Sequence, residues 1–138
     1  MPESSIAEIL RSARTIAVVG CSPRPSQTSH YIAVYLQRAG YDVVPVNPHH
    51  TELLGVPCFS SLTDIPPDVN IDIVNVYRRP QFTAQVVADA AERAASTGNK
   101  PVVWTQLGVS SPDAEALAIE HGLPYVRERC IMVEHGIV

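Results

Sequence analysis

The segment TIAVVGCSPRPSQTSHYIAVYLQRAGYDVVPVN, residues 15–47, decides the fold. It starts with the compact apolar run Thr15–Gly20, which is typical of a strand buried on both faces. Apolar residues at helical spacing follow and predict a helix, with Thr28 or Ser29 as its expected N-terminal cap. A second apolar run, Asp42–Val46, completes a strand–helix–strand unit, and such units contain parallel strands.

The rest of the chain continues this alternation. Ser5-Ile6-Ala7-Glu8 has the pattern of a capping box, Pro80 and Gly98 bound the longest predicted helix, and Ser111-Pro112-Asp113 predicts another helix start. The apolar stripe of the longest helix is predicted at Phe82, Val86, Ala90 and Ala94. Further strands are expected at residues 71–77, 101–105 and 124–126, and an irregular stretch at residues 49–67 with one helical turn at 61–65. We predict an α/β fold: a single Rossmann-like domain over residues 1–138, with a five-stranded parallel sheet and helices on both faces.

Composition excludes several classes of protein. Hydrophobic residues make up 46% and charged residues 17% of the 138 residues, which is a globular composition. No apolar run approaches the roughly 18–20 residues of a membrane span, and the N-terminus lacks the pattern of a secretory signal. A net charge of −4 argues against nucleic acid as the main partner, because phosphate backbones require a broad basic face. We expect a cytoplasmic protein with neither a membrane nor a nucleic acid as partner.

Cysteines and histidines give no framework for disulfides or metals. Cys21, Cys58 and Cys130 form no CxxC pair, which favours a reducing compartment, and the five histidines fall into no ligand spacing. No metal site is therefore predicted. Cys21 is expected to be a buried small residue under a tight loop, and Cys58 and Cys130 are expected to pack, as is Trp104, the only tryptophan.

Cationic side chains follow the ends of two of the predicted strands. In an open parallel sheet, ligands bind beyond the carboxyl ends of the strands. Arg24 lies in the loop after the first strand, and Arg78 and Arg79 follow the third. The start of the next helix adds free backbone N–H groups. These features predict an anion site that suits a nucleotide pyrophosphate.

The glycine and acid pattern of a dinucleotide site is missing. Gly20 is the only glycine between Thr15 and Ala39, so there is no GxGxxG turn, and Asn47 stands where a ribose-binding acid is expected. A P-loop is also absent, and the only lysine, Lys100, opens a strand at the opposite edge of the sheet.

In its motifs, the chain resembles the small coenzyme A (CoA)-binding domain proteins, whose Rossmann-type fold is similar to the CoA-binding domain of succinyl-CoA synthetase alpha subunits. The segments that carry the resemblance are IAVVGCSPRPSQTSHYIAVYLQRAGYDVVPVNP, GVPCFSSLTDIP, IDIVNVYRRP, VVWTQLGV and RERCIMVEH. Two residues depart from the family pattern. Cys21 stands where a small residue such as alanine is common, and Glu128 stands where aspartate is usual. Neither change removes a cation.

The resemblance implies CoA or an acyl-CoA as the ligand, and a set of binding residues. Contacts to the adenosine 3′-phosphate and the pyrophosphate are implied for the loop Gly20–Ser26, for Asn47-Pro48 and for Tyr77-Arg78-Arg79, and the pantetheine would follow Gln106–Gly108. His30, on the first turn of a helix, either donates to a phosphate or packs. The candidate binding residues are Gly20, Cys21, Ser22, Arg24, Ser26, His30, Asn47, Pro48, Tyr77, Arg78, Arg79, Gln106 and Gly108.

Three functions remain open at this stage. The favoured one is a stand-alone binding or accessory module without catalysis of its own, because no nucleophile–base pair or metal cluster occurs in the pattern. The second is a CoA-linked enzyme whose chemistry comes from a partner chain or from Cys21, whose thiol pKa a helix start and Arg24 would lower. The third is a regulator that binds NAD or another nucleotide. A protein partner is left open.

Overall fold

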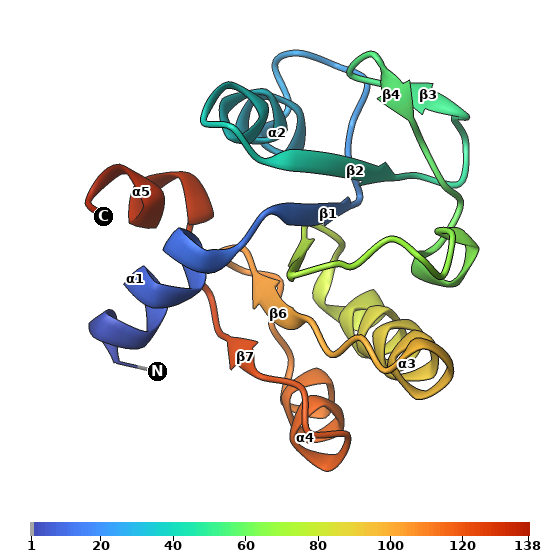
Figure 1. Ribbon diagram of the computed structural model, residues 1–138, viewed down its shortest axis with the longest axis vertical. Coiled ribbons are helices and arrows are strands. Elements are labelled where there is room, and N and C mark those ends of the chain that lie inside the picture. Colours follow the sequence, from blue (N-terminus) through green and yellow to red (C-terminus); the bar gives the residue numbers. More distant parts are fainter. Residues whose placement is uncertain (1) are drawn as a thin grey trace.

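A five-stranded parallel sheet forms the centre of the computed structural model, which describes residues 2–138. The strand order is β2-β1-β5-β6-β7 (Figure 1). The strands of this sheet are β1 (Thr15–Val19), β2 (Asp42–Val46), β5 (Ile73–Val76), β6 (Val102–Thr105) and β7 (Tyr125–Val126). The helices are α1 (Glu3–Ser12), α2 (Thr28–Arg38), α3 (Pro80–Thr97), α4 (Pro112–Glu120) and α5 (Ile131–Gly136). The predicted fold class is confirmed.

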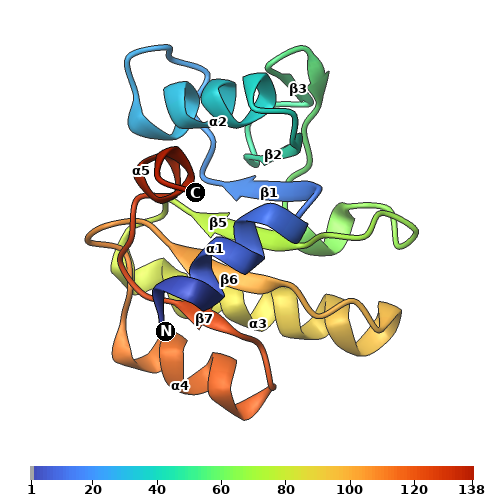
Figure 2. The same ribbon diagram turned by 60° about the vertical axis from the view of Figure 1, so that its left-hand side comes forward.

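Helices cover both faces of the sheet (Figures 1 and 2). Helices α3 and α4 pack on one face, where Val86 and Ala114 belong to one hydrophobic cluster with Val74. Helices α1, α2 and α5 pack on the other, where Ile32 joins a second cluster around the fully buried Trp104. Both faces of each central strand are thus buried, which explains why the strands read as continuous apolar runs.

Several predicted boundaries agree with the structure. Strand β2 covers the predicted residues, and α3 begins at Pro80 and ends before Gly98, which caps it in the left-handed conformation. At the start of α4 the Ser111 hydroxyl accepts a hydrogen bond from the backbone N–H of Ala114 at 3.1 Å, as an N-cap does. The helical turn predicted at residues 61–65 is the 3-10 helix η1 (Leu62–Asp64).

Three local predictions are wrong. Helix α1 begins at Glu3, so Ser5 lies inside it and forms no capping box. Helix α2 begins at Thr28 after Gln27, without a side-chain cap, because the Ser29 hydroxyl instead accepts a hydrogen bond from the Ser22 N–H at 2.9 Å. Phe82 does not belong to the buried stripe of α3, since its side chain is 43% exposed.

Two elements have no counterpart in the sequence-based prediction. Within the stretch expected to be irregular, β3 (Glu52–Leu53) and β4 (Val56–Pro57) form a short antiparallel hairpin. After β7, the chain forms α5, which packs against α1 and α2. Both elements are short, with two residues in each strand and six in the helix.

The order of the strands reverses next to β1. From β1 the chain passes through α2 to β2 on one side, and the later strands β5, β6 and β7 lie on the other. The connections that leave β1 and β5 also run to opposite faces, because α2 and α3 cover different faces. A crevice between the ends of β1 and β5 follows from this topology, and it is the place where doubly wound sheets bind their ligands.

Candidate functional site

The loops that follow β1 and β5 touch at the crevice. Gly20 has φ +85°, and a β-carbon built there would lie 3.3 Å from the carbonyl carbon of Tyr77 and 3.4 Å from Cγ of Arg78. Two features favour glycine at this point: the backbone is left-handed, and a β-carbon would meet the neighbouring chain at an unusually short distance. This contact separates two cavities that share Gly20.

The first cavity, called here the α3 cavity, lies on the α3 face and has a volume of about 200 Å³. Its walls are mostly apolar, and the polar groups that line it include Arg78, Gln85 and Asp89. The apolar lining residues are Val19, Val46, Pro48, Leu62, Phe82 and Val86.

The second cavity, called here the α2 cavity, lies at the start of α2 and has a volume of about 390 Å³. Its lining is more polar and includes Ser22, Tyr77 and Gln106, with Leu107 and Val109 as apolar members. The two cavities lie on either side of Gly20, which lines both, and the α3 cavity is the more apolar of the two.

The alternation of side chains along β5 explains which cavity each residue lines. Val74 and Val76 face the α3 and α4 layer, whereas Ile73 and Tyr77 face the α2 layer. Because alternate residues of an extended chain point to opposite faces, the next residue, Arg78, returns to the α3 side. Arg78 is half-buried and lines the α3 cavity, and its guanidinium carbon lies 4.8 Å from the centre of the Phe82 ring.

The three predicted cations differ in their surroundings. Arg78 lines a cavity, whereas Arg24 and Arg79 are exposed, with Arg79 in extended conformation immediately before α3. Among residues 2–138, none of the three forms an ion pair, so their charge is not neutralised by the protein.

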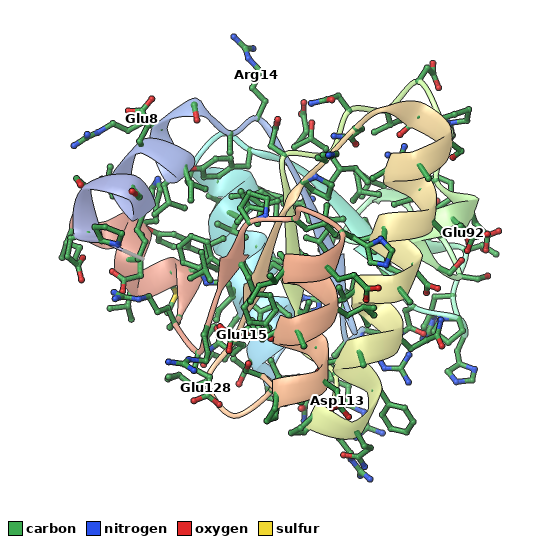
Figure 3. All side chains as sticks on the ribbon, turned by 90° about the horizontal axis from the view of Figure 1, so that it is seen from below. Glu8, Arg14, Glu92, Asp113, Glu115 and Glu128 are labelled. Carbon is green, nitrogen blue, oxygen red and sulfur yellow. The ribbon has the colours of Figure 1, made fainter. Side chains whose placement is uncertain are left out.

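The arginines near β7 are neutralised. Arg127 pairs with Glu115 at 3.3 Å, and Arg129 pairs with Glu134 at 2.8 Å and with Glu3 at 2.9 Å. Figure 3 shows Asp113, Glu115 and Glu128 at the same end of the molecule as the start of α4. Free positive charge is therefore available in the loops after β1 and β5, whereas the two arginines after β7 are paired with carboxylates.

Asn47 and His30 hold the loop after β1 in place. The Asn47 amide donates to the carbonyl oxygen of Cys21 at 2.9 Å, and Asn47 Oδ1 accepts from the His49 N–H at 2.8 Å. His30 Nδ1 lies 2.8 Å from the carbonyl oxygen of Ser22, so that Nδ1 is the protonated nitrogen that donates. These contacts fix the path of the loop that borders the α2 cavity.

The structure brings six of the candidate residues to the cavities. Gly20, Ser22, Pro48, Tyr77, Arg78 and Gln106 line one or both of them. The candidates that line neither cavity are Cys21, Arg24, Ser26, His30, Asn47, Arg79 and Gly108. Contact with a ligand stays a prediction for the whole set. The lining residues that sequence reasoning missed include Gln85 and Asp89, which carry no motif and are found only from the position of α3.

Two buried polar atoms of the α2 cavity have no hydrogen-bond partner. They are the hydroxyl of Tyr77 and Oε1 of Gln106. Burial raises the pKa of the Tyr77 hydroxyl well above its usual range, and it therefore stays protonated and able to donate. Buried polar groups are normally paired, so this donor and this acceptor stand out as unsatisfied in residues that line the α2 cavity.

Cys21 is a buried thiol rather than an activated one. Its side chain is fully buried, and burial raises its pKa to about 12, with a smaller contribution from the neighbouring Cys58. The expectation of a buried Cys21 is confirmed, and the alternative that a helix start and Arg24 lower its pKa is wrong, because desolvation dominates. Nucleophilic chemistry at Cys21 loses its support.

Ellman's reagent at about pH 8 is expected to modify Cys130 in the folded protein and to spare Cys21 and Cys58. Cys130 is half-buried, while Cys21 and Cys58 are buried with raised pKa values. For Cys21, a pKa about four units above the pH leaves on the order of one thiolate in ten thousand. Mass spectrometry locates the label, and Cys130→Ser is the control. Rapid labelling of Cys21 in the folded protein would contradict this assignment.

Among residues 2–138, no group of three or more histidine, cysteine, aspartate or glutamate side chains is arranged to hold a metal ion. No helix in this range has both the length and the apolarity that a bilayer crossing requires.

Fold and site together define a Rossmann-like α/β domain with a two-cavity crevice at its switch point. Residues 14–136 match the family model described as CoA binding domain, and the chain belongs to this family. The resemblance found from the sequence motifs is thereby confirmed.

Two similar proteins align with nearly the full length of the chain. The Bacillus subtilis (strain 168) protein described as uncharacterized protein YneT is 41% identical over 135 residues, which cover 98% of this chain and 95% of YneT. A solved structure of a hypothetical protein from Pyrococcus horikoshii OT3 is 38% identical, has a TM-score of 0.91, and aligns over 99% of this chain and 92% of its own.

Larger relatives contain this domain as a small part. Acetate–CoA ligase (ADP-forming) I of Archaeoglobus fulgidus is 29% identical over 116 residues. These residues cover 84% of this chain and 16% of the ligase. Most of the ligase therefore has no counterpart in this chain.

Proposed function

We propose that this chain binds coenzyme A or an acyl-CoA in the β1–β5 crevice and acts as a binding or accessory module without catalysis of its own. The observation that carries the proposal is the close approach of Gly20 to Tyr77 and Arg78, because Arg78, without an ion pair among residues 2–138, lines the α3 cavity and Tyr77 lines the α2 cavity. A CoA molecule has the matching sequence of parts: an apolar base, phosphates and an extended amide chain.

Each part of the ligand has suitable protein groups. The adenosine suits the apolar walls of the α3 cavity. The phosphates suit Arg78 at its rim, together with the loop after β1. The pantetheine suits the α2 cavity, because an amide N–H can donate to Oε1 of Gln106 and an amide carbonyl can accept from the Tyr77 hydroxyl. Arg24 and Arg79 would act from the solvent side, and Asn47 and His30 through the loop they hold.

The proposal also covers the domain organisation and the cellular compartment. Residues 1–138 act as one domain, and the three free thiols support a reducing compartment, the cytoplasm. The ligase activity named for the Archaeoglobus fulgidus relative is not carried over, since the match covers 16% of that protein. A partner chain that completes an enzyme and a nucleotide-binding regulator remain as competing functions.

Isothermal titration with CoA, acetyl-CoA, dephospho-CoA, NAD, NADP and ATP tests the proposal. We expect CoA and acetyl-CoA to bind tightest, and dephospho-CoA to bind more weakly because it lacks the 3′-phosphate that a cation can read. Acetyl-CoA should be recovered intact after incubation with the protein alone. Tighter binding of NAD, or hydrolysis of acetyl-CoA, would replace the proposal with one of the competing functions.

A further inference from the structure

Helix α3 presents two polar side chains to the α3 cavity that the general role of CoA binding does not require. They are Gln85, which is exposed, and the half-buried Asp89, one helical turn apart on the same face of the helix. The Gln85 amide donates to Asp89 Oδ1 at 2.9 Å. One N–H of the Gln85 amide is engaged in this way. The pair keeps two acceptors, the remaining carboxylate oxygen of Asp89 and the Gln85 amide oxygen, and one further N–H of Gln85.

The charges along the cavity differ from one end to the other. Phe82, which Arg78 covers, and Asp89 are seven residues apart on α3, about 10 Å along the helix axis. The Arg78 end attracts phosphate, whereas the Asp89 end repels it. Within residues 2–138, Asp89 forms no ion pair that would cancel its charge. The group that occupies the Asp89 end should therefore be neutral and should donate hydrogen bonds.

The space between the two ends suits a flat ring. Pro48, Leu62 and Val86 are among the residues that line the cavity with apolar surface. The base is the part of CoA that combines an apolar face with a hydrogen-bond donor at its edge, the 6-amino group of adenine.

We propose, on the basis of the function proposed above, that Asp89 accepts a hydrogen bond from the 6-amino group of the adenine and makes the site selective for a 6-aminopurine. Gln85 is a positioning residue, which holds the Asp89 carboxylate toward the cavity. A 6-oxopurine would bring a carbonyl oxygen against the carboxylate, and two facing acceptors are unfavourable.

The test compares CoA with its hypoxanthine analogue, in which an oxygen replaces the 6-amino group. Isothermal titration of the wild-type protein should give CoA an affinity about tenfold higher than the analogue. Asp89→Asn keeps the size of the side chain, and its amide can donate to the 6-oxygen or accept from the 6-amino group. This variant should bind both ligands with affinities within about twofold of each other.

Two further variants separate the roles. Glu92→Gln removes the same charge from an exposed position of the same helix, outside the α3 cavity, and should keep the tenfold preference. Gln85→Leu should lower the affinity for CoA and leave the affinity for the hypoxanthine analogue unchanged. A purely structural role of Gln85 would not alter the ratio of the two affinities.

The outcomes distinguish this inference from the function on which it rests. If the wild-type protein binds neither ligand, the proposed function fails. If it binds CoA and the hypoxanthine analogue equally well, the function stands and the selectivity inference is overturned. A tenfold preference that survives in Asp89→Asn also overturns it, because another group then reads the base.

Discussion

Replacing Gly20 with alanine is expected to lower the free energy of unfolding by about 1–3 kcal/mol and to weaken CoA binding about tenfold or more. Alanine is strained at φ +85°, and its β-carbon would lie 3.3 Å from the Tyr77 carbonyl carbon. The atom that this β-carbon would meet belongs to the backbone of Tyr77, which cannot rotate away as a flexible side chain can. The loop after β5 would therefore shift, and Arg78, whose Cγ lies 3.4 Å from the same point, would shift with it.

A second glycine provides a matched control. Gly98 has a similar φ, +79°, but a β-carbon there would meet nothing within 4 Å, and the residue lies at the far end of α3. Gly98→Ala should lose stability through backbone strain alone and bind CoA like the wild type. Urea unfolding measures the stability and isothermal titration the affinity. If Gly20→Ala binds CoA normally, the contact between the two loops does not shape the site.

The parts of the fold that sequence predicts well are those with strong local signals. The limits of α3 follow from Pro80 and Gly98, which act through fixed or positive φ values whatever the surroundings. The central strands follow from apolar runs, because helices cover both of their faces. Local sequence patterns do not show which of several possible hydrogen bonds a side chain forms. The Ser29 hydroxyl accepts a hydrogen bond from the Ser22 N–H and is therefore not available to cap α2.

The missed elements lack such signals. Helix α5 spans six residues and buries only Ile131, so no periodic stripe can develop. The β3–β4 hairpin turns at Leu54 and Gly55, both with positive φ. Leucine rarely adopts this conformation, so the sequence does not have the Asn-Gly or Asp-Gly pattern that marks such a turn.

The sequence predicts where the site lies, but it does not predict which residues are exposed and which line a cavity. Parallel strands place the residues after β1 and β5 at one edge of the sheet, which is enough to select Gly20, Tyr77 and Arg78. Exposure depends on how the loops leave that edge, and Arg24 lies on the part of its loop that faces solvent. Asp89 is two turns beyond Phe82 along α3, and only the packing of α3 against the sheet brings it to the cavity.

Arg78→Ala is expected to weaken CoA binding about tenfold or more, and Arg79→Ala by clearly less. A charge-assisted hydrogen bond to phosphate contributes roughly 1.5–3 kcal/mol, and each 1.4 kcal/mol corresponds to about a tenfold change in affinity. Arg78 is half-buried, lines the α3 cavity and has its guanidinium held over Phe82 at 4.8 Å. Less side-chain freedom is therefore lost when it binds a phosphate.

Arg79 is a matched comparison because it carries the same charge and directly follows Arg78 in the sequence. Its side chain is exposed, and water and salt screen its interaction with any anion, so Arg79→Ala should cost on the order of 1 kcal/mol or less. Both variants should unfold like the wild type, since neither side chain belongs to the buried core. Isothermal titration at low and high salt measures the ranking, and the effect of Arg79→Ala should shrink more at high salt. If Arg78→Ala binds CoA normally while Arg79→Ala does not, the cation that reads the phosphate lies outside the α3 cavity. If both bind normally, the ligand phosphates do not lie at the end of β5.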